Sequence, residues 1–355
     1  MPGRPPIFLA VAERLRGQLA AGAWSDGLPA ERALAAALKV SRTTLRKALD
    51  ALAEVGERPA PRRADWPRVL FLAQRHGHVN DRITASMVEA CAQSGMHVDL
   101  SCQTHFPPWS DRLRSTIRTT ASGCRCLVAN VSDIAEIDAL DLPRNIVRIA
   151  FGFHHPGTIL AGWHVVISDR LRAAYESVGH LHALGHRHIG LVCGGDAGVA
   201  GQHWGRPWKR DAAWLGWSAG IAAFEARAGT TLCLGHDDDL WEAQALRWLR
   251  LRDRPSALVL DMDWRARPFI AACARLGLSI PGDLALTSSG DTPWAVASTP
   301  QLTTWSYEPE TVGRVMALLA AGRQDPAGTV IAIAPRLVER GSAGPPRQNR
   351  GRISG

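Results

Sequence analysis

The chain has little of what a membrane protein, a disulfide-rich secreted protein or a zinc protein needs. No apolar run approaches the ~18 residues of a membrane-spanning helix, although 46% of the 355 residues are hydrophobic. The seven cysteines are odd in number and form no Cys-x-x-Cys pair, which predicts buried thiols. The first residues lack the apolar segment and cleavage site of a secretion signal, so we expect a cytoplasmic protein.

Motifs of catalysis and cofactor binding are missing as well. The glycine-rich stretch 194–198 lacks the Lys-Ser/Thr of a phosphate-binding loop, and no Gly-x-Ser-x-Gly or dinucleotide fingerprint occurs. His182 and His186 are four residues apart, but no glutamate accompanies them as in a His-Glu-x-x-His zinc site. We therefore expect no enzyme, no cofactor and no metal, and we interpret these histidines as structural.

Lysine is scarce, with only three residues, so arginine carries most of the net charge of +8. Residues 1–66 hold eleven basic and seven acidic side chains, a net +4, and residues 341–355 hold three arginines and no acid, a net +3. The residues between them have a net charge of only +1. An excess of positive charge at a small terminal domain is typical of a polyanion-binding protein.

Three helices are predicted near the N-terminus. Apolar residues at three- and four-residue spacing predict a helix over 7–21, Pro29 suits the start of a second helix that runs to Leu38, and Ser41 suits the cap of a third. The third helix then exposes hydroxyl and guanidinium groups on its first turns, which are donors for phosphates and base edges. The pattern predicts a helix-turn-helix whose third helix reads DNA; the alternative is an ordinary helical hairpin with a solvated face.

The segments AERLRGQLAAG, LPAERALAAAL and VSRTTLRKALDALAEVG resemble the GntR family of winged-helix regulators over about 50 residues. This resemblance implies that Arg32 contacts a phosphate or groove edge. It further implies major-groove contacts by Arg42, Thr44 and Arg46, and phosphate contacts by Ser41 and Thr43.

The segment that follows departs from that family. The family forms a β-hairpin wing here, whereas residues 57–67 contain three prolines, which disfavour a paired hairpin. We expect a reduced wing. Arg62 and Arg63 either replace its minor-groove contacts or belong to a stiff linker.

From Val69 onward, short apolar runs alternate with helical patterns, which predicts a doubly wound α/β fold of two lobes. A ligand cleft is expected at the carboxyl ends of the strands. We expect strands near 69–73, 97–100, 125–130, 146–151, 189–193, 257–261 and 284–288, with helices near 87–94, 110–121, 170–184, 212–227, 240–250 and 265–276.

Three landmarks resemble the LacI and periplasmic sugar-binding superfamily: residues 165–194, 255–305 and 335–342, the last reading PRLVERGS. The resemblance implies a type I periplasmic-binding-protein-like sensor that dimerises and binds a small, carbohydrate-type effector. We expect four segments: 1–56, a helix-turn-helix DNA-binding domain; 57–67, a Pro/Arg linker; 68–342, the effector-binding and dimerisation domain; and 343–355, a disordered basic tail.

The effector positions that the resemblance implies are altered. Met262 replaces the usual Asn before Asp263, Gly290 replaces the first acid before Asp291, and Ala213 replaces an Arg, with Arg210 one turn earlier. Tryptophans on loops at strand ends offer stacking faces instead, with core packing as the alternative. We expect the effector-binding residues to be Asp263, Asp291, Arg210, Trp204, Trp264 and Trp294.

These features predict a DNA-binding transcriptional regulator that acts as a homodimeric repressor. Its expected partner is double-stranded operator DNA, and no membrane partner is expected. Two alternatives stay open. One is a cytoplasmic small-molecule-binding protein whose helical head serves another partner, and the other is a regulator that has lost effector sensing.

Overall fold

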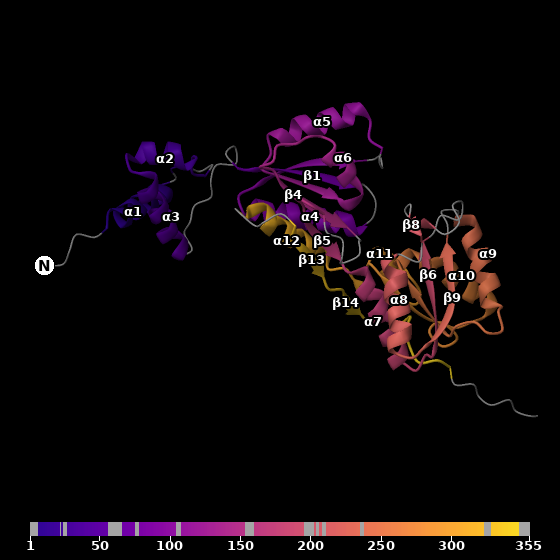
Figure 1. Ribbon diagram of the computed structural model, residues 1–355. Helices are drawn as coiled ribbons and strands as arrows, with labels where there is room; N and C mark the ends of the chain where they lie inside the picture. The colour runs from indigo at the N-terminus through magenta and orange to yellow at the C-terminus, as the bar shows by residue number, and fades with distance from the viewer. Residues whose placement is uncertain are drawn as a thin grey trace, which may run out of the picture.

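The computed structural model contains a small helical domain followed by two α/β lobes (Figure 1). It describes residues 6–21, 23, 27–55, 66–74, 78–103, 108–152, 160–194, 202–203, 206–207, 211–234, 238–322 and 328–347. The linker positions 57–65, with Arg62 and Arg63, lie outside these residues.

The N-terminal domain consists of α1 (Ile7–Ala20), α2 (Glu31–Leu38) and α3 (Arg42–Glu54). Lys39, in the left-handed conformation with φ 57°, ends α2, and Ser41 caps α3. We expected α2 to begin at Pro29. It begins two residues later, at Glu31, because Ala30 still has an extended backbone. The apolar faces of the three helices meet in one core, in which each buried leucine contributes about 2 kcal/mol. Its largest buried members are Leu15, Leu28, Leu34, Leu38, Leu45, Leu49 and Leu52.

Lobe 1 is built on a parallel sheet in the order β13-β5-β4-β3-β1-β2. Helices α4 (His78–Gln93) and α12 (Pro309–Ala321) cover one face, and α5 (Asp111–Ser122) and α6 (Ile134–Asp138) cover the other (Figure 1). The central strands read as nearly continuous apolar runs because both of their faces are buried. They are β1 (Arg68–Gln74), β2 (His97–Gln103), β3 (Cys126–Asn130), β4 (Val147–Gly152), β5 (His164–Ser168) and β13 (Val330–Ile333).

Lobe 2 is built on a second six-stranded sheet, in the order β14-β12-β11-β10-β6-β9, with only β14 antiparallel to its neighbour. Helices α7 (Arg170–Ala183) and α8 (Ala212–Ala223) pack on one face, and α9 (Asp238–Leu249) and α10 (Arg267–Leu276) on the other. The strands are β6 (His188–Gly194), β9 (Arg227–Leu234), β10 (Ala257–Leu260), β11 (Ala285–Ser289), β12 (Thr303–Ser306) and β14 (Arg336–Val338). Short elements complete the lobe: η4 (Asp263–Ala266), α11 (Pro293–Ala297), and the two-residue strands β7 (Gln202–His203) and β8 (Arg206–Pro207).

The chain crosses between the lobes three times: from β5 to α7, from β12 to α12, and from β13 to β14. The two-lobed, doubly wound α/β fold is therefore confirmed. The expected tail requires one correction, because residues 343–347 pack on lobe 2. The Gly344 carbonyl bonds His186 at 2.9 Å, and the Arg347 amide donates to the Gly282 carbonyl, also at 2.9 Å.

Candidate DNA-reading helix and effector site

The first turn of α3 is organised by its own side chains. The Ser41 hydroxyl accepts a hydrogen bond from the Thr44 amide at 3.0 Å and bonds the Thr44 hydroxyl at 2.8 Å. A serine cap of this kind stabilises a helix by about 1 kcal/mol. Two of the six predicted DNA-contacting residues thus hold the helix start in place, while Thr43 beside them is exposed.

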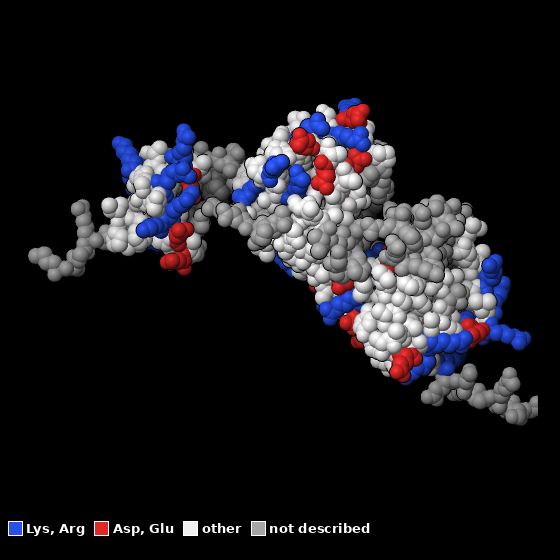
Figure 2. Space-filling view, in the orientation of Figure 1, with Lys and Arg blue, Asp and Glu red and all other residues white. Residues whose placement is uncertain are grey.

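The three predicted arginines of this domain differ in their surroundings. Arg32 and Arg42 are exposed and make no ion pair or hydrogen bond with the residues that the structure describes. Arg46 is also exposed, but its Nε donates to Oε2 of Glu31 at 2.8 Å. Figure 2 shows basic side chains over much of the visible face of this domain, with acidic ones at its lower edge. DNA contact by these residues remains a prediction.

Asp263, at the start of η4, is only 1% exposed. Its Oδ1 accepts from the hydroxyls of Ser288 at 2.6 Å and Thr304 at 2.7 Å, and its Oδ2 accepts from the amide and hydroxyl of Thr292 at 2.7 and 2.9 Å. Burial raises the pKa of Asp263, while these four donors act in the opposite direction. The carboxylate therefore holds the loops after β10 and β11 together, and its predicted effector contact is untested.

Asp291, the second predicted carboxylate, lies in the loop after β11 in the left-handed conformation, with φ 51°. Its Oδ1 accepts from Nη2 of Arg340 at 2.6 Å, and both side chains are mostly buried. Its carbonyl oxygen accepts from Nη1 of Arg82, on α4 of lobe 1, at 3.3 Å. Asp291 thus takes part in a contact between the two lobes.

A cluster of buried charges that the sequence did not reveal lies near the first crossing. Arg170 is 7% exposed and lies 3.5 Å from Asp211 and 3.4 Å from Asp261. Asp261 also accepts from Nε of Arg265 at 2.5 Å and from the Gly194 amide at 2.9 Å. Asp261 and Arg265 are four residues apart, but Asp261 precedes η4 and is not on a helix, so local spacing did not predict this pair.

Electrostatics keep Arg170 charged. Burial would lower the pKa of Arg170, but the neighbouring Asp211, Tyr307 and Asp261 outweigh burial and raise it. Burial raises the pKa of Tyr307 to about 12, so the phenol stays protonated. Oppositely charged, hydrogen-bonded partners are what allow charges to stay buried. The start of α7, directly after the first crossing, is therefore held in lobe 2 by buried ion pairs.

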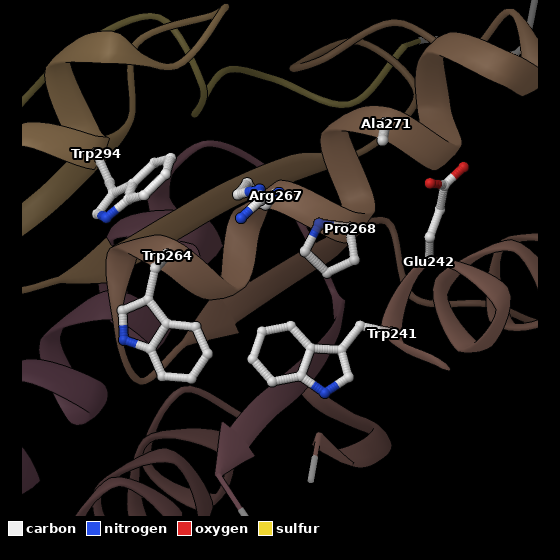
Figure 3. A pocket seen from close by; sticks show the side chains of 7 residues that line it. All are labelled: Trp241, Glu242, Trp264, Arg267, Pro268, Ala271 and Trp294. Atoms are coloured by element: carbon white, nitrogen blue, oxygen red, sulfur yellow. The ribbon is translucent and has the colours of Figure 1, made fainter. Parts of the chain in front are cut away.

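The tryptophans line a different part of lobe 2, a hollow of about 470 Å³ (Figure 3). Trp264 stacks on Trp241 with ring centroids 5.0 Å apart, and Trp294 lies 5.5 Å from the guanidinium of Arg267. Trp241, in the first turn of α9, was not among the predicted effector residues. The hollow is lined by Trp241, Glu242, Trp264, Arg267, Pro268, Ala271 and Trp294.

The predicted effector residues are therefore not all brought together. Trp264 and Trp294 share the hollow, whereas Asp263 and Asp291 are not among its lining residues and are held by protein donors. Trp204 and Arg210 lie outside the described residues.

No described helix is long and apolar enough to span a bilayer. Among the placed residues, no three or more His, Cys, Asp and Glu side chains gather as metal ligands would. His186 is bound to the Ser256 hydroxyl at 2.8 Å and to the Gly344 carbonyl, which is a structural arrangement.

Comparison with known proteins fits this division of the chain. Residues 8–56 match the model of the bacterial regulatory proteins of the gntR family, and residues 178–343 match a periplasmic binding protein-like domain. The chain joins these two domains. A gntR-type helix-turn-helix thus precedes a periplasmic-binding-protein-like unit, as the sequence resemblances predicted.

The solved structures agree with the lobes. A LacI-family transcriptional regulator from Bifidobacterium animalis subsp. lactis superposes with a TM-score of 0.63 at 20% identity, over 79% of this chain and 98% of that one. The lac repressor dimer bound to operator and the anti-inducer ONPF gives 0.62 at 17% identity, over 83% and 97%. At these identities the likeness concerns the fold.

Among curated proteins, the lactose operon repressor of Rhizobium radiobacter is 40% identical over 72 residues. That match spans 20% of this chain and 64% of the relative.

Proposed function

We propose that this gntR-type, two-lobed chain is a DNA-binding transcriptional regulator that acts as a repressor. The observation that carries the proposal is the capped α3, with Arg42, Thr43 and Arg46 exposed on its first turns. Such a helix places donors against phosphates and base edges in a major groove. The operator-bound lac repressor dimer, with its similar two-lobed fold, supports the same role.

The test compares binding to the duplex upstream of the chain's own coding sequence with binding to random duplex, over a range of salt concentrations. We expect the upstream duplex to bind at least a thousandfold more tightly, as specific regulators do. Arg42→Gln should lower this preference about tenfold or more, because a bidentate contact contributes about 1–3 kcal/mol of discrimination. Arg112→Gln on α5 is the matched control, since it removes an exposed arginine from lobe 1. Equal affinity for both duplexes would contradict the proposal.

The regulator is proposed to act as a homodimer whose two α3 helices meet a pseudo-palindrome with half-sites about one turn of DNA apart. Analytical ultracentrifugation should give a dimer mass at operator-binding concentrations. Footprinting should show two protected half-sites. A monomeric complex on a single half-site would contradict this part of the proposal.

Control by a small effector of carbohydrate type, bound between the lobes at the strand ends, completes the leading proposal. A sugar panel in a thermal unfolding assay tests it, because a ligand at a hundred times its Kd stabilises by about 2.7 kcal/mol. A stabilising sugar that also changes operator affinity is the expected result.

A second candidate is a regulator that has lost effector sensing. It is favoured by the state of Asp263 and Asp291, whose carboxylates are already engaged by protein donors. This candidate is supported over the first if no sugar or other metabolite stabilises the protein against thermal unfolding while operator binding stays intact.

A further inference from the structure

We infer that Glu31 is a positioning residue that directs Arg46 toward a base edge rather than toward the phosphate backbone. The inference rests on the proposed function, since it concerns how the same helix-turn-helix discriminates between sequences. Glu31 begins α2, and Arg46 lies one turn into α3, fifteen residues further along the chain.

The helix core sets the geometry of the pair. Leu34 of α2 is 1% exposed and Leu45 of α3 is fully buried, and both belong to the core that joins the three helices. Glu31 lies one turn before Leu34, and Arg46 directly follows Leu45, so this packing holds the two side chains within reach of each other. Nε of Arg46 donates to Glu31 Oε2 at 2.8 Å. The two side chains are 31% and 50% exposed, so the contact lies at the surface that would meet DNA.

The contact has a chemical consequence for Arg46. A guanidinium is a planar group with five N–H donors in a fixed arrangement. With Nε engaged by Glu31, the plane of the group is oriented and the two Nη atoms remain for a ligand. Two N–H donors side by side match O6 and N7 of guanine, the commonest specific contact of arginine in the major groove.

Charge adds a second consequence. The Glu31 carboxylate offsets the positive charge of Arg46 and repels a phosphate that approaches the pair. Arg32 has no carboxylate partner among the described residues, so its charge is fully available to the backbone. Phosphate contacts give affinity without sequence information. In this domain Arg32 is thus suited to a general phosphate contact, and Arg46 to an oriented base contact.

The test measures upstream and random duplex binding of Glu31→Gln in the full chain at several salt concentrations. We expect tighter binding to random duplex, with a salt slope steeper by about 0.9 because Arg46 gains a phosphate. The ratio of upstream to random affinity should fall about tenfold. Glu13→Gln is the control, because Glu13 pairs with Arg16 on α1 and its loss changes the charge of the same domain equally. It should leave the affinity ratio unchanged.

A double-mutant cycle shows whether Glu31 acts through Arg46. In an Arg46→Gln background, Glu31→Gln should no longer change the affinity ratio. If Glu31→Gln behaves like Glu13→Gln while the unsubstituted chain discriminates upstream from random duplex, the inference about Glu31 is wrong and the proposed function stands. If the unsubstituted chain does not discriminate, the proposed function fails, and the inference fails with it. Helical circular dichroism confirms that each variant is folded.

Discussion

His186 shows how one buried side chain makes lobe 2 sensitive to pH. The Gly344 carbonyl can only accept, so Nε2 of His186 donates to it, and Nδ1 of the neutral ring accepts from the Ser256 hydroxyl. Burial lowers the pKa of His186 below its ordinary value of 6.5, and nearby Arg187 lowers it further, while the bond to Gly344 acts against them. The folded lobe therefore takes up this proton at lower pH than the unfolded chain does.

The sign of the pH effect follows from this lowered pKa. The stabilisation by neutral His186 is complete above pH 6.5 and is lost as the pH falls through the lowered pKa. We expect lobe 2 to be less stable in urea at pH 5.5 than at pH 7.5, and His186→Gln to reduce that difference. His97→Gln, at an exposed histidine, should leave it unchanged. An equal pH difference in both variants would contradict this account.

The sequence indicated the acids after β10 and β11, but it did not indicate their hydrogen-bond donors. The resemblance to the LacI superfamily indicated Asp263 and Asp291. The donors to Asp263 come from Ser288, Thr292 and Thr304, 25 to 41 residues away. Such contacts depend on the order of strands in the sheet, which local patterns do not contain. The sequence therefore located the polar groups, and only the fold revealed that they are already paired.

Helix α8 approaches α7 closely, because it places glycine where the two helices meet. A Cβ built on Gly216 would lie 1.9 Å from the Leu171 carbonyl oxygen, and one on Gly220 would lie 2.8 Å from Cβ of Val178. The Leu171 oxygen belongs to the backbone, so it cannot move aside without shifting α7. This contact makes Gly216 a requirement of the helix pair.

Gly216→Ala should destabilise lobe 2 by about 3 kcal/mol, the upper range of overpacking effects. Gly17→Ala on α1 is the matched control, since nothing lies within 4 Å of its Cβ. It should stabilise the N-terminal domain by about 0.5–1 kcal/mol, because alanine is the better helix former. Urea unfolding followed by circular dichroism measures both changes. A neutral Gly216→Ala would show that the helices can separate without cost.

Elements with strong local patterns were predicted well, and those that depend on distant partners were missed. Apolar spacing located α1, α3 and most central strands. Strand β9 was missed because Arg227, Gly229 and its threonines interrupt the apolar run. Strand β13 was missed because it completes lobe 1 by pairing with β5, about 165 residues earlier in the chain. That pairing depends on the second crossing, which returns the chain to lobe 1 before β13.

For the whole molecule, three crossings make the lobes interdependent. Arg170 follows the first crossing and lies against Asp261 of lobe 2, and its charge also interacts with Tyr307 on the second crossing. Arg170, Asp211 and Asp261 all belong to lobe 2, so a movement of one lobe against the other leaves these buried ion pairs intact. Rearrangement of the lobes is therefore expected at contacts nearer the surface.

Arg82 makes a contact between the lobes that lies near the surface. Its Nε and Nη2 bond the Glu310 carboxylate at 2.7 and 3.1 Å, and Nη1 donates to the Asp291 carbonyl at 3.3 Å. Glu310 and Arg82 both belong to helices of lobe 1, while Asp291 belongs to lobe 2. The side chain of Arg82 is 39% exposed, so water can replace its partners when the lobes move.

We predict that Arg82→Gln loosens the Asp291 loop without unfolding either lobe. The loss of one interlobe hydrogen bond, about 0.5–1.5 kcal/mol, should speed amide exchange at residues 291–295 by about twofold to tenfold. Arg314→Gln is the control. Arg314 lies on α12, the helix of Glu310, and among the described residues its side chain donates only to Thr311 of the same helix. Hydrogen exchange with mass spectrometry provides the readout. Equal exchange in the two variants would show that the Arg82–Asp291 contact does not restrain the lobes.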